Sequence, residues 1–260
     1  MFAPGRGDLD ITDPAAFAAV LAARRPAAVI NAAAVSQVDR AETEPGRVEA
    51  VNAVAPGRMA QACAAAGVPL IHVSSDYVFG AATDRPWTEA DPVSPINAYG
   101  RLKVEGEARV RAAGGRSCTV RVAWLFGDGE DFIAGLLRRG AGTSARVAED
   151  QIGSPTPIHA LAERMLALAD RLIAGDPAIP PILHLAGSPP VSRADWVEAA
   201  FQAVVAAGGR PPPLIRARMA DFPSAAPRPT YSALDSGRAA ELFGGALDWR
   251  AALAGAFGGL

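Results

Sequence analysis

Lysine is almost absent from this chain. Of its 25 basic residues, Lys103 is the only lysine and all the others are arginine. A lysine ammonium is a compact charge with three donors, whereas the arginine guanidinium is planar and differs in reach and hydrogen-bonding geometry. A chain so rich in arginine that keeps one lysine indicates a chemical requirement at position 103.

Cysteine is also scarce. Cys63 lies in an alanine-rich helix pattern and Cys118 begins a strand pattern, and they are the only two cysteines. No CxxC motif occurs, and no histidine is spaced with them as a zinc site requires. We therefore expect no metal site and no disulfide, but two small core residues in a reducing compartment.

Long hydrophobic runs and a strong net charge are missing as well. No apolar stretch approaches the roughly 20 residues that span a bilayer, and Met1 is not followed by a basic and then apolar signal segment. The formal charge is −2 at pH 7, which favours neither nucleic acid nor an anionic membrane surface as a partner. The sequence thus predicts a cytoplasmic protein.

What the chain does contain is an alternation of strand and helix patterns. The apolar runs Ala27–Ala34, Val68–Ser75 and Cys118–Phe126 are typical of strands buried on both faces. A polar loop is expected over Ser36–Glu44 and a helix over Glu49–Gly67. Strand, helix and strand at these spacings predict an α/β fold with a Rossmann-like, doubly wound parallel sheet.

The pattern changes after Gly127. Shorter helices and strands are separated by turn-rich and proline-rich segments from there to the end of the chain. We expect residues 1–127 to form the dinucleotide-binding part and residues 128–260 to form mainly a smaller lobe over the crevice. Some segments of the second half are expected to return to the first.

The stretch Val73–Gly106 carries the strongest chemical signal. A strand delivers Ser75 to its carboxyl end, and a helix beginning near Asn97 places Tyr99 and Lys103 four residues apart on one face. A cation beside a phenol favours the phenolate, which suits a tyrosine that exchanges a proton. YxxxK also occurs by accident on helices, but the upstream strand and serine are the context that the motif requires.

Two further residues have a functional and a structural interpretation. Trp124, near the carboxyl end of a strand, either packs in the core or covers a ring of a ligand. Arg228, fixed between prolines, either grips a phosphate or carboxylate or is a solvated surface residue. The sequence alone leaves both alternatives open.

Six segments together resemble one family. In order, they are NAAAVSQVDRAE, VSSDYVFG, INAYGRLKVEGE, RVAWLFG, EDQIGSPT and PRPTYSALD. They resemble dTDP-4-dehydrorhamnose reductase, an extended short-chain dehydrogenase/reductase. The resemblance implies that NADPH or NADH gives a hydride to the 4-keto carbon of dTDP-4-dehydro-L-rhamnose, yielding dTDP-L-rhamnose.

The resemblance also implies roles for single residues. Tyr99 would protonate the alkoxide, Lys103 would assist it and hold the nicotinamide ribose, and Ser75 completes the catalytic set. The implied cofactor-binding residues are Asp10, Ile11, Ala34, Val35, Ser36, Tyr99 and Lys103. The implied substrate-binding residues are Ser75, Asp76, Trp124 and Arg228. A homodimer is a further expectation.

One departure from the family pattern concerns the start of the chain. The glycine-rich strand, turn and helix that hold the pyrophosphate in such folds are not found, since Gly5 and Gly7 follow no strand. A start placed too far downstream is favoured over a real truncation. We expect the chain as written to bind NADPH weakly, and a chain extended upstream by roughly 25 to 35 residues, about one strand, turn and helix, to recover binding.

Two other functions are therefore kept as alternatives. One is a non-catalytic or regulatory member of the fold, resembling the methionine adenosyltransferase beta subunit, which the missing glycine turn favours. The other is a reductase of a different nucleotide 4-keto sugar.

Overall fold

The centre of the molecule is a parallel sheet of four strands. The computed structural model describes residues 1–127, 129–139 and 142–257. The strand order is β1 (Val29–Asn31), β2 (Leu70–Ser75), β3 (Ser117–Val122) and β8 (Ile182–His184), each parallel to its neighbour. The predicted α/β class with a parallel sheet is confirmed.

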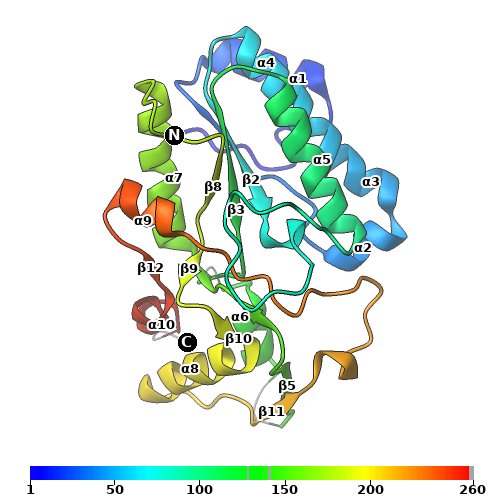
Figure 1. Cartoon of the computed structure of the whole chain (residues 1–260), viewed down its shortest axis with the longest axis vertical. Coiled ribbons are helices and arrows are strands. Elements are labelled where there is room, and N and C mark those ends of the chain that lie inside the picture. Colours follow the sequence, from blue (N-terminus) through cyan, green and yellow to red (C-terminus); the bar gives the residue numbers. More distant parts are fainter. Residues whose placement is uncertain (128, 140–141, 258–260) are drawn as a thin grey trace.

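Helices cover both faces of this sheet (Figure 1). On one face lie α1 (Pro14–Arg24), α4 (Ala55–Ala65) and α5 (Ala98–Ala112), which share a core with Leu70 of β2. On the other face lie α7 (Ile158–Ile173) and α9 (Gly237–Phe243), which pack on Ile71 and on β3. Successive β2 side chains thus point to opposite layers, as the period of two in a strand requires.

For the segment after β1, one prediction was wrong, and the predicted helix is present but is not a single regular α-helix. The expected loop Ser36–Glu44 contains α2 (Val38–Thr43), whose end is held by an ion pair between Arg40 and Glu44 at 2.7 Å. The expected single helix Glu49–Gly67 is divided. It comprises the end of α3 (Pro45–Glu49), a π-helical segment over Ala50–Val54 and then α4. Pro56, in the first turn of α4, is compatible with a helix start but not with a regular helix interior, which accounts for the interruption before it.

The predicted strand Cys118–Phe126 is also divided. β3 ends at Val122, and β4 (Leu125–Phe126) pairs with the short β7 (Thr156–Pro157) instead of continuing in the sheet. The break falls next to Trp124, whose φ of 39° is incompatible with extended backbone. Its side chain is thereby redirected at the carboxyl edge of the sheet.

A second core fills the other end of the molecule (Figure 1). It is built from α6 (Phe132–Leu137), β5 (Ala145–Ala148), α8 (Arg193–Ala206), β11 (Leu214–Ala217) and α10 (Trp249–Phe257). The remaining short strands are β6 (Ile152–Gly153), β9 (Gly187–Ser188), β10 (Val191–Ser192) and β12 (Leu247–Asp248). The expected boundary after residue 127 lies beside residue 128, which is outside the described residues.

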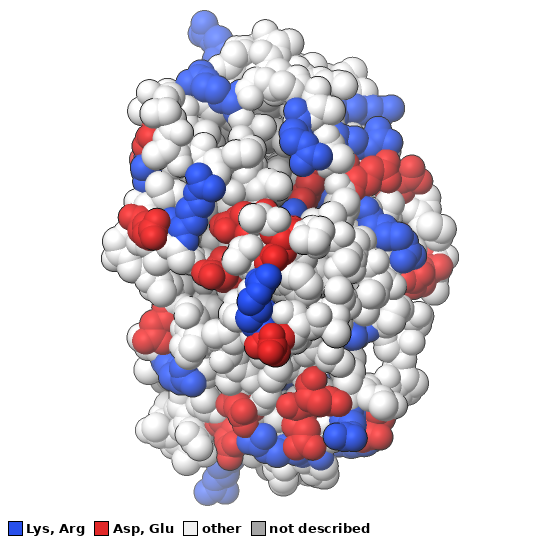
Figure 2. Space-filling model, in the orientation of Figure 1, with Lys and Arg blue, Asp and Glu red and all other residues white. Residues whose placement is uncertain are grey.

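Charges of both signs are interspersed over the face drawn in Figure 2. Within residues 1–127, 129–139 and 142–257, no helix has the length and apolar character needed to cross a membrane. The same described residues hold no group of three or more histidine, cysteine, aspartate or glutamate side chains that could bind a metal ion.

Candidate active site

Ser75 lies at the carboxyl end of β2, where the chain turns into a short 3-10 helix over Asp76–Val78. Its hydroxyl accepts from the Tyr77 amide at 3.2 Å and donates to Asp76 Oδ1 at 2.9 Å. Asp76 Oδ2 accepts from the Ser232 hydroxyl at 2.6 Å. Both Asp76 oxygens are thus engaged by protein hydroxyls, and the carboxyl group orients Ser75.

Burial governs the ionisation of Asp76. The residue is 4% exposed, and burial raises the pKa of its carboxyl group to about 6 although the hydroxyls of Ser232 and Ser75 act in the opposite direction. An anion in a low-dielectric site is disfavoured unless it is well solvated by donors. The Asp76 carboxyl group therefore changes its protonation state near pH 6, which is within the pH range of an ordinary enzyme assay.

Tyr99 and Lys103 are presented by the first turns of α5. The Asn97 side chain caps this helix by accepting from the Gly100 amide at 2.7 Å, and its Nδ2 donates to the Pro227 carbonyl at 2.9 Å. Gly100 is a close-contact position, since a Cβ there would lie 2.1 Å from the Tyr77 carbonyl oxygen. The helix start therefore packs directly on the 3-10 helix that follows Ser75.

The structure brings Tyr99 to Ser75, but Lys103 bonds elsewhere. Burial raises the pKa of the Tyr99 phenol, and hydrogen bonding to Ser75 opposes this only in part. Lys103 is 2% exposed, and its ammonium donates to the Val73 carbonyl at 2.7 Å. Burial also lowers the pKa of Lys103 to about 8. We had expected the Lys103 ammonium to stabilise the Tyr99 phenolate and so to lower the pKa of Tyr99. The structure corrects this expectation, because burial has the larger effect and raises that pKa.

Trp124 is partly buried and packs against the second core, with its ring centroid 5.7 Å from that of Trp196. Its indole rests on Gly153, where a Cβ would come within 2.2 Å of the ring. The Arg193 guanidinium covers the ring at 3.9 Å from its centroid. The indole Nε1 is buried without a hydrogen-bond partner among the described residues. A strained φ together with an unpaired donor is typical of a functional position.

Arg228 is engaged by protein groups. One terminal nitrogen donates to Asp39 Oδ2 at 2.8 Å and the other to the Ala226 carbonyl at 3.0 Å. Its side chain is 16% exposed, against 49% for Asp39. Asp39 belongs to α2, so this ion pair ties the loop that carries Arg228 to the first half of the chain.

A pocket of about 420 Å³ lies where the cofactor residues were predicted. It is lined by Pro4, Arg6, Leu9, Asp10, Ile11, Thr12, Ala32–Val35, Arg47, Ala50 and Val51. Ser36 is not part of this lining, whereas Val35 is fixed at both its backbone amide and carbonyl by the buried Asn52 side chain. Small alanines and two arginines fit the adenosine half and a phosphate of a dinucleotide.

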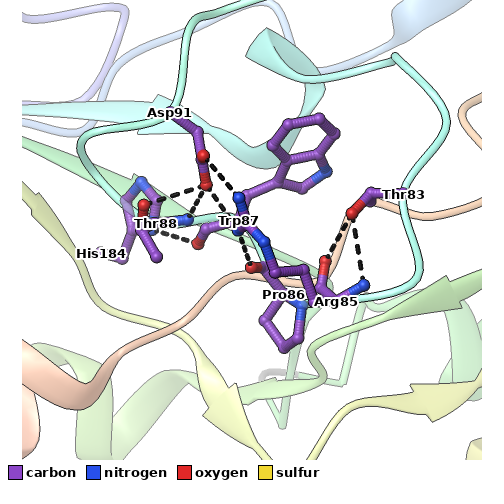
Figure 3. A network of polar contacts seen from close by, with 7 residues as sticks. All are labelled: Thr83, Arg85, Pro86, Trp87, Thr88, Asp91 and His184. Atoms are coloured by element: carbon purple, nitrogen blue, oxygen red, sulfur yellow. Dashed lines mark hydrogen bonds and ion pairs between the residues drawn. The ribbon is translucent and has the colours of Figure 1, made fainter.

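The segment after Ser75 is supported by the turn of residues 83–91 (Figure 3). Trp87 stacks on Phe79 at 4.7 Å between ring centroids, and its carbonyl lies 3.1 Å from Nδ1 of His184. Asp91 closes the turn by accepting from the Thr88 amide at 2.7 Å and pairing with Arg85 at 2.8 Å. The turn of residues 83–91 thereby connects the segment after Ser75 to β8.

The structure adds four residues that the sequence analysis did not identify. Tyr77, Gln151, Arg193 and Ser232 converge around Asp76 and Trp124. Gln151 and Ser232 fall within the quoted segments EDQIGSPT and PRPTYSALD, so those segments were the available signal. Arg193 carried none, because it begins an ordinary amphipathic helix.

Comparison with known proteins identifies the family. Residues 1–258 match the family model described as RmlD substrate binding domain. A dTDP-4-dehydrorhamnose reductase of Mycolicibacterium smegmatis is 46% identical over 231 residues, covering 86% of this chain and 68% of that protein. One from Mycobacterium tuberculosis is 42% identical over 234 residues, covering 87% and 74%.

Comparison with solved structures leads to the same family. The crystal structure of a dTDP-4-dehydrorhamnose reductase from Clostridium acetobutylicum has a TM-score of 0.88 at 30% identity, covering 98% of this chain and 88% of that one. One from Bacillus anthracis, in complex with NADP, has a TM-score of 0.87 at 27% identity, covering 98% and 89%. The chain therefore belongs to the RmlD substrate binding domain family, and its predicted resemblance to the dTDP-4-dehydrorhamnose reductases is confirmed.

Proposed function

We propose that this chain reduces the 4-keto group of dTDP-4-dehydro-L-rhamnose to give dTDP-L-rhamnose, with NADPH or NADH as hydride donor. The observation that carries the proposal is the convergence of Ser75 and Tyr99 at the carboxyl end of β2, with Lys103 one turn further along α5. Relatives named dTDP-4-dehydrorhamnose reductase and a neighbour bound to NADP support it.

Tyr99 acts as the general acid in this mechanism. Its raised pKa keeps the phenol protonated at neutral pH, so a proton is available for the alkoxide formed at C4. Ser75, oriented by Asp76, hydrogen-bonds the same oxygen. Lys103, buried one turn further along the same helix, would assist Tyr99 and hold the nicotinamide ribose of the cofactor. The reduced nicotinamide, when bound, supplies the hydride.

The remaining predicted contacts form part of the same proposal. Asp10, Ile11, Ala34, Val35 and Ser36 hold the cofactor, and the first four of these line the pocket next to β1. For the substrate, Trp124 covers the sugar nucleotide, Asp76 acts by holding Ser75, and Arg228 borders the site from its loop. Residues 1–127 form the cofactor-binding lobe. Residues 128–260 form mainly the substrate-binding lobe.

An assay of NADPH oxidation with dTDP-4-dehydrorhamnose and with its UDP counterpart tests the proposed function. We expect turnover with the dTDP sugar. Turnover only with an unrelated ketone would refute the proposal.

Replacing the general acid is the first prediction. Tyr99→Phe keeps the buried ring but removes the proton donor, so kcat is expected to fall about 10²- to 10⁴-fold. The circular dichroism spectrum should be unchanged, because the fold stays intact. A variant that keeps more than about a tenth of wild-type kcat would remove Tyr99 from this role.

A second candidate is a reductase of another dTDP 4-keto sugar. A relative from Streptomyces antibioticus that is 36% identical over 258 residues is named a probable dTDP-4,6-dihydroxy-2-methyloxan-3-one 4-ketoreductase. The same assay with that ketone separates the two candidates, because the preferred substrate has the higher kcat/KM.

The proposed homodimer is tested separately by light scattering coupled to size-exclusion chromatography.

A further inference from the structure

Arg193 carries a guanidinium whose terminal nitrogens have no protein acceptor. The residue begins α8 and is partly buried. Its Nε donates to Gln151 Oε1 at 2.6 Å. Among the described residues, neither terminal nitrogen has a hydrogen bond or an ion pair within 4.0 Å. The planar fork that binds oxyanions in a bidentate manner is therefore unused by the fold.

The side chain is nevertheless held firmly. Its guanidinium lies 3.9 Å from the centroid of the Trp124 ring and 5.0 Å from that of Phe132. Its backbone amide also donates to the Gln151 carbonyl at 2.8 Å. Stacking and two bonds to one glutamine fix the direction of the fork without neutralising it.

The charged groups around Arg193 act on it electrostatically, but within the described part of the chain none of them forms an ion pair with it. Asp76 is the carboxyl group that faces it, and both Asp76 oxygens already accept from Ser75 and Ser232. Tyr77 faces it as well, with a phenol whose pKa burial raises. A second guanidinium, that of Arg228, is near enough to act on Arg193, and together with burial it lowers the pKa of Arg193.

We propose that Arg193 binds the diphosphate of the nucleotide sugar, with Trp124 as the platform that aims its fork. Two guanidinium groups brought together in partly desolvated surroundings repel each other, and an anion within reach of both relieves that repulsion. Arg228 is largely engaged by Asp39 and the Ala226 carbonyl, which leaves Arg193 as the principal anion contact. This role rests on the proposed function, because it takes the nucleotide sugar as ligand.

The test compares ligands that differ only in phosphate. Isothermal titration of the full chain with dTDP, dTMP and thymidine is carried out for wild type, Arg193→Met and Arg193→Lys. The methionine keeps an unbranched apolar stem, and the lysine keeps the charge but loses the fork. Arg210→Met, at an exposed loop position, is the matched control.

We expect Arg193→Met to weaken dTDP binding about 10- to 100-fold, the range of one or two charge-assisted hydrogen bonds. Thymidine and NADPH affinities should be unchanged, and Arg210→Met should bind dTDP as wild type does. Arg193→Lys should bind dTDP less tightly than wild type, which keeps the test valid if the methionine variant does not fold.

Unchanged dTDP affinity in both Arg193 variants overturns the inference, as does an equal loss for thymidine, which would indicate a purely structural role. Failure of the proposed function is a distinguishable result. A wild-type chain that binds dTDP through Arg193 but reduces no dTDP 4-keto sugar refutes the reaction and leaves the anion site standing.

Discussion

Burial sets the proton chemistry of the two residues that open α5. Tyr99 is 8% and Lys103 is 2% exposed, and desolvation shifts each pKa toward the neutral form, raising that of the phenol and lowering that of the ammonium to about 8. A neutral phenol suits a proton donor. The charge on Lys103, in contrast, depends on pH within the range of an ordinary assay.

The second prediction follows from Lys103. Its pKa of about 8 means that kcat should fall as pH rises through that value, because the ammonium loses its proton. Lys103→Arg keeps its charge to much higher pH, so that decline should vanish, but its planar fork does not fit the Val73 contact and turnover should drop overall. Measuring kcat from pH 6 to 10 checks both. A wild-type profile that stays flat from pH 7 to 10 contradicts the prediction.

The third prediction concerns Asp76. Its folded-state pKa is raised from 3.8 to about 6, so the folded protein holds this proton more tightly than the unfolded chain. The resulting stability is fully present below about pH 4 and is lost as pH rises through about 6. The shift corresponds to about 3 kcal/mol at most.

The measurement is urea denaturation of wild type and Asp76→Asn between pH 4 and pH 8. Since asparagine does not titrate, the stability of wild type relative to the variant should decrease across that interval. A difference that does not change with pH would show that Asp76 titrates at an ordinary pKa in the folded state.

At the scale of elements, the site depends on how closely α5 approaches the sheet. Glu107 of α5 pairs with Arg121 of β3 at 2.7 Å, both nearly inaccessible to solvent, and also accepts from the Ser74 hydroxyl. Gly100 lets the start of α5 pack on the 3-10 helix that follows Ser75, and Gly106 lets its middle pack on the π-helical segment, since a Cβ at either would lie within 2.4 Å of the carbonyl oxygen of Tyr77 or of Asn52. The ion pair fixes the helix over the sheet, and Gly100 lets its start come near enough for Tyr99 to reach Ser75.

The fourth prediction is that Gly100→Ala damages stability and activity together. The added methyl would lie 2.1 Å from the Tyr77 carbonyl oxygen, so the start of α5 must shift, at a cost of about 1–3 kcal/mol. Displacing Tyr99 should also lower kcat.

Gly255→Ala in α10 is the matched control, because nothing lies within 4 Å of its added Cβ. In a helix interior this change should stabilise the protein by up to about 1 kcal/mol. Thermal denaturation of both variants checks the pair. Equal melting temperatures for Gly100→Ala and wild type would contradict the packing argument.

At the scale of the whole molecule, the loop of residues 222–235 links the two cores. The Ser232 hydroxyl reaches Asp76, the Pro227 carbonyl accepts from Asn97, and Arg228 reaches Asp39. Asp39 accepts from the Ala226 amide as well, at 2.9 Å. This loop is therefore bonded to three separate segments of the first half of the chain.

The fifth prediction is that Asp39→Ala loosens this loop without unfolding the protein. The Asp39 side chain is 49% exposed, and exposed ion pairs contribute about 0–1 kcal/mol to stability. Hydrogen exchange of peptides spanning residues 222–230 should nevertheless become faster. Glu44→Ala, which breaks a local pair with Arg40, serves as control, and identical exchange in the two variants would contradict the linking role.

The amino-acid sequence by itself determined the parallel α/β architecture and where its main strands lie along the chain. Continuous apolar runs such as Val68–Ser75 specify buried strands, and the capping asparagine at position 97 specifies the start of α5. These are local effects of periodicity and side-chain capping, which act within a few residues. The spacing of Tyr99 and Lys103 on one helix face was predictable for the same reason.

Only the tertiary structure decided the ionisation and the partners of the site. Asp76 and Ser232 are 156 positions apart, and Gln151 and Arg193 are 42 apart, so no local pattern encodes their contact. The left-handed backbone of Trp124 could not be predicted, because the residue lies in a continuous apolar run that is typical of a single strand. Desolvation acts through all the surroundings of a group, and for this reason the phenol pKa was raised where the nearby lysine alone had suggested the opposite.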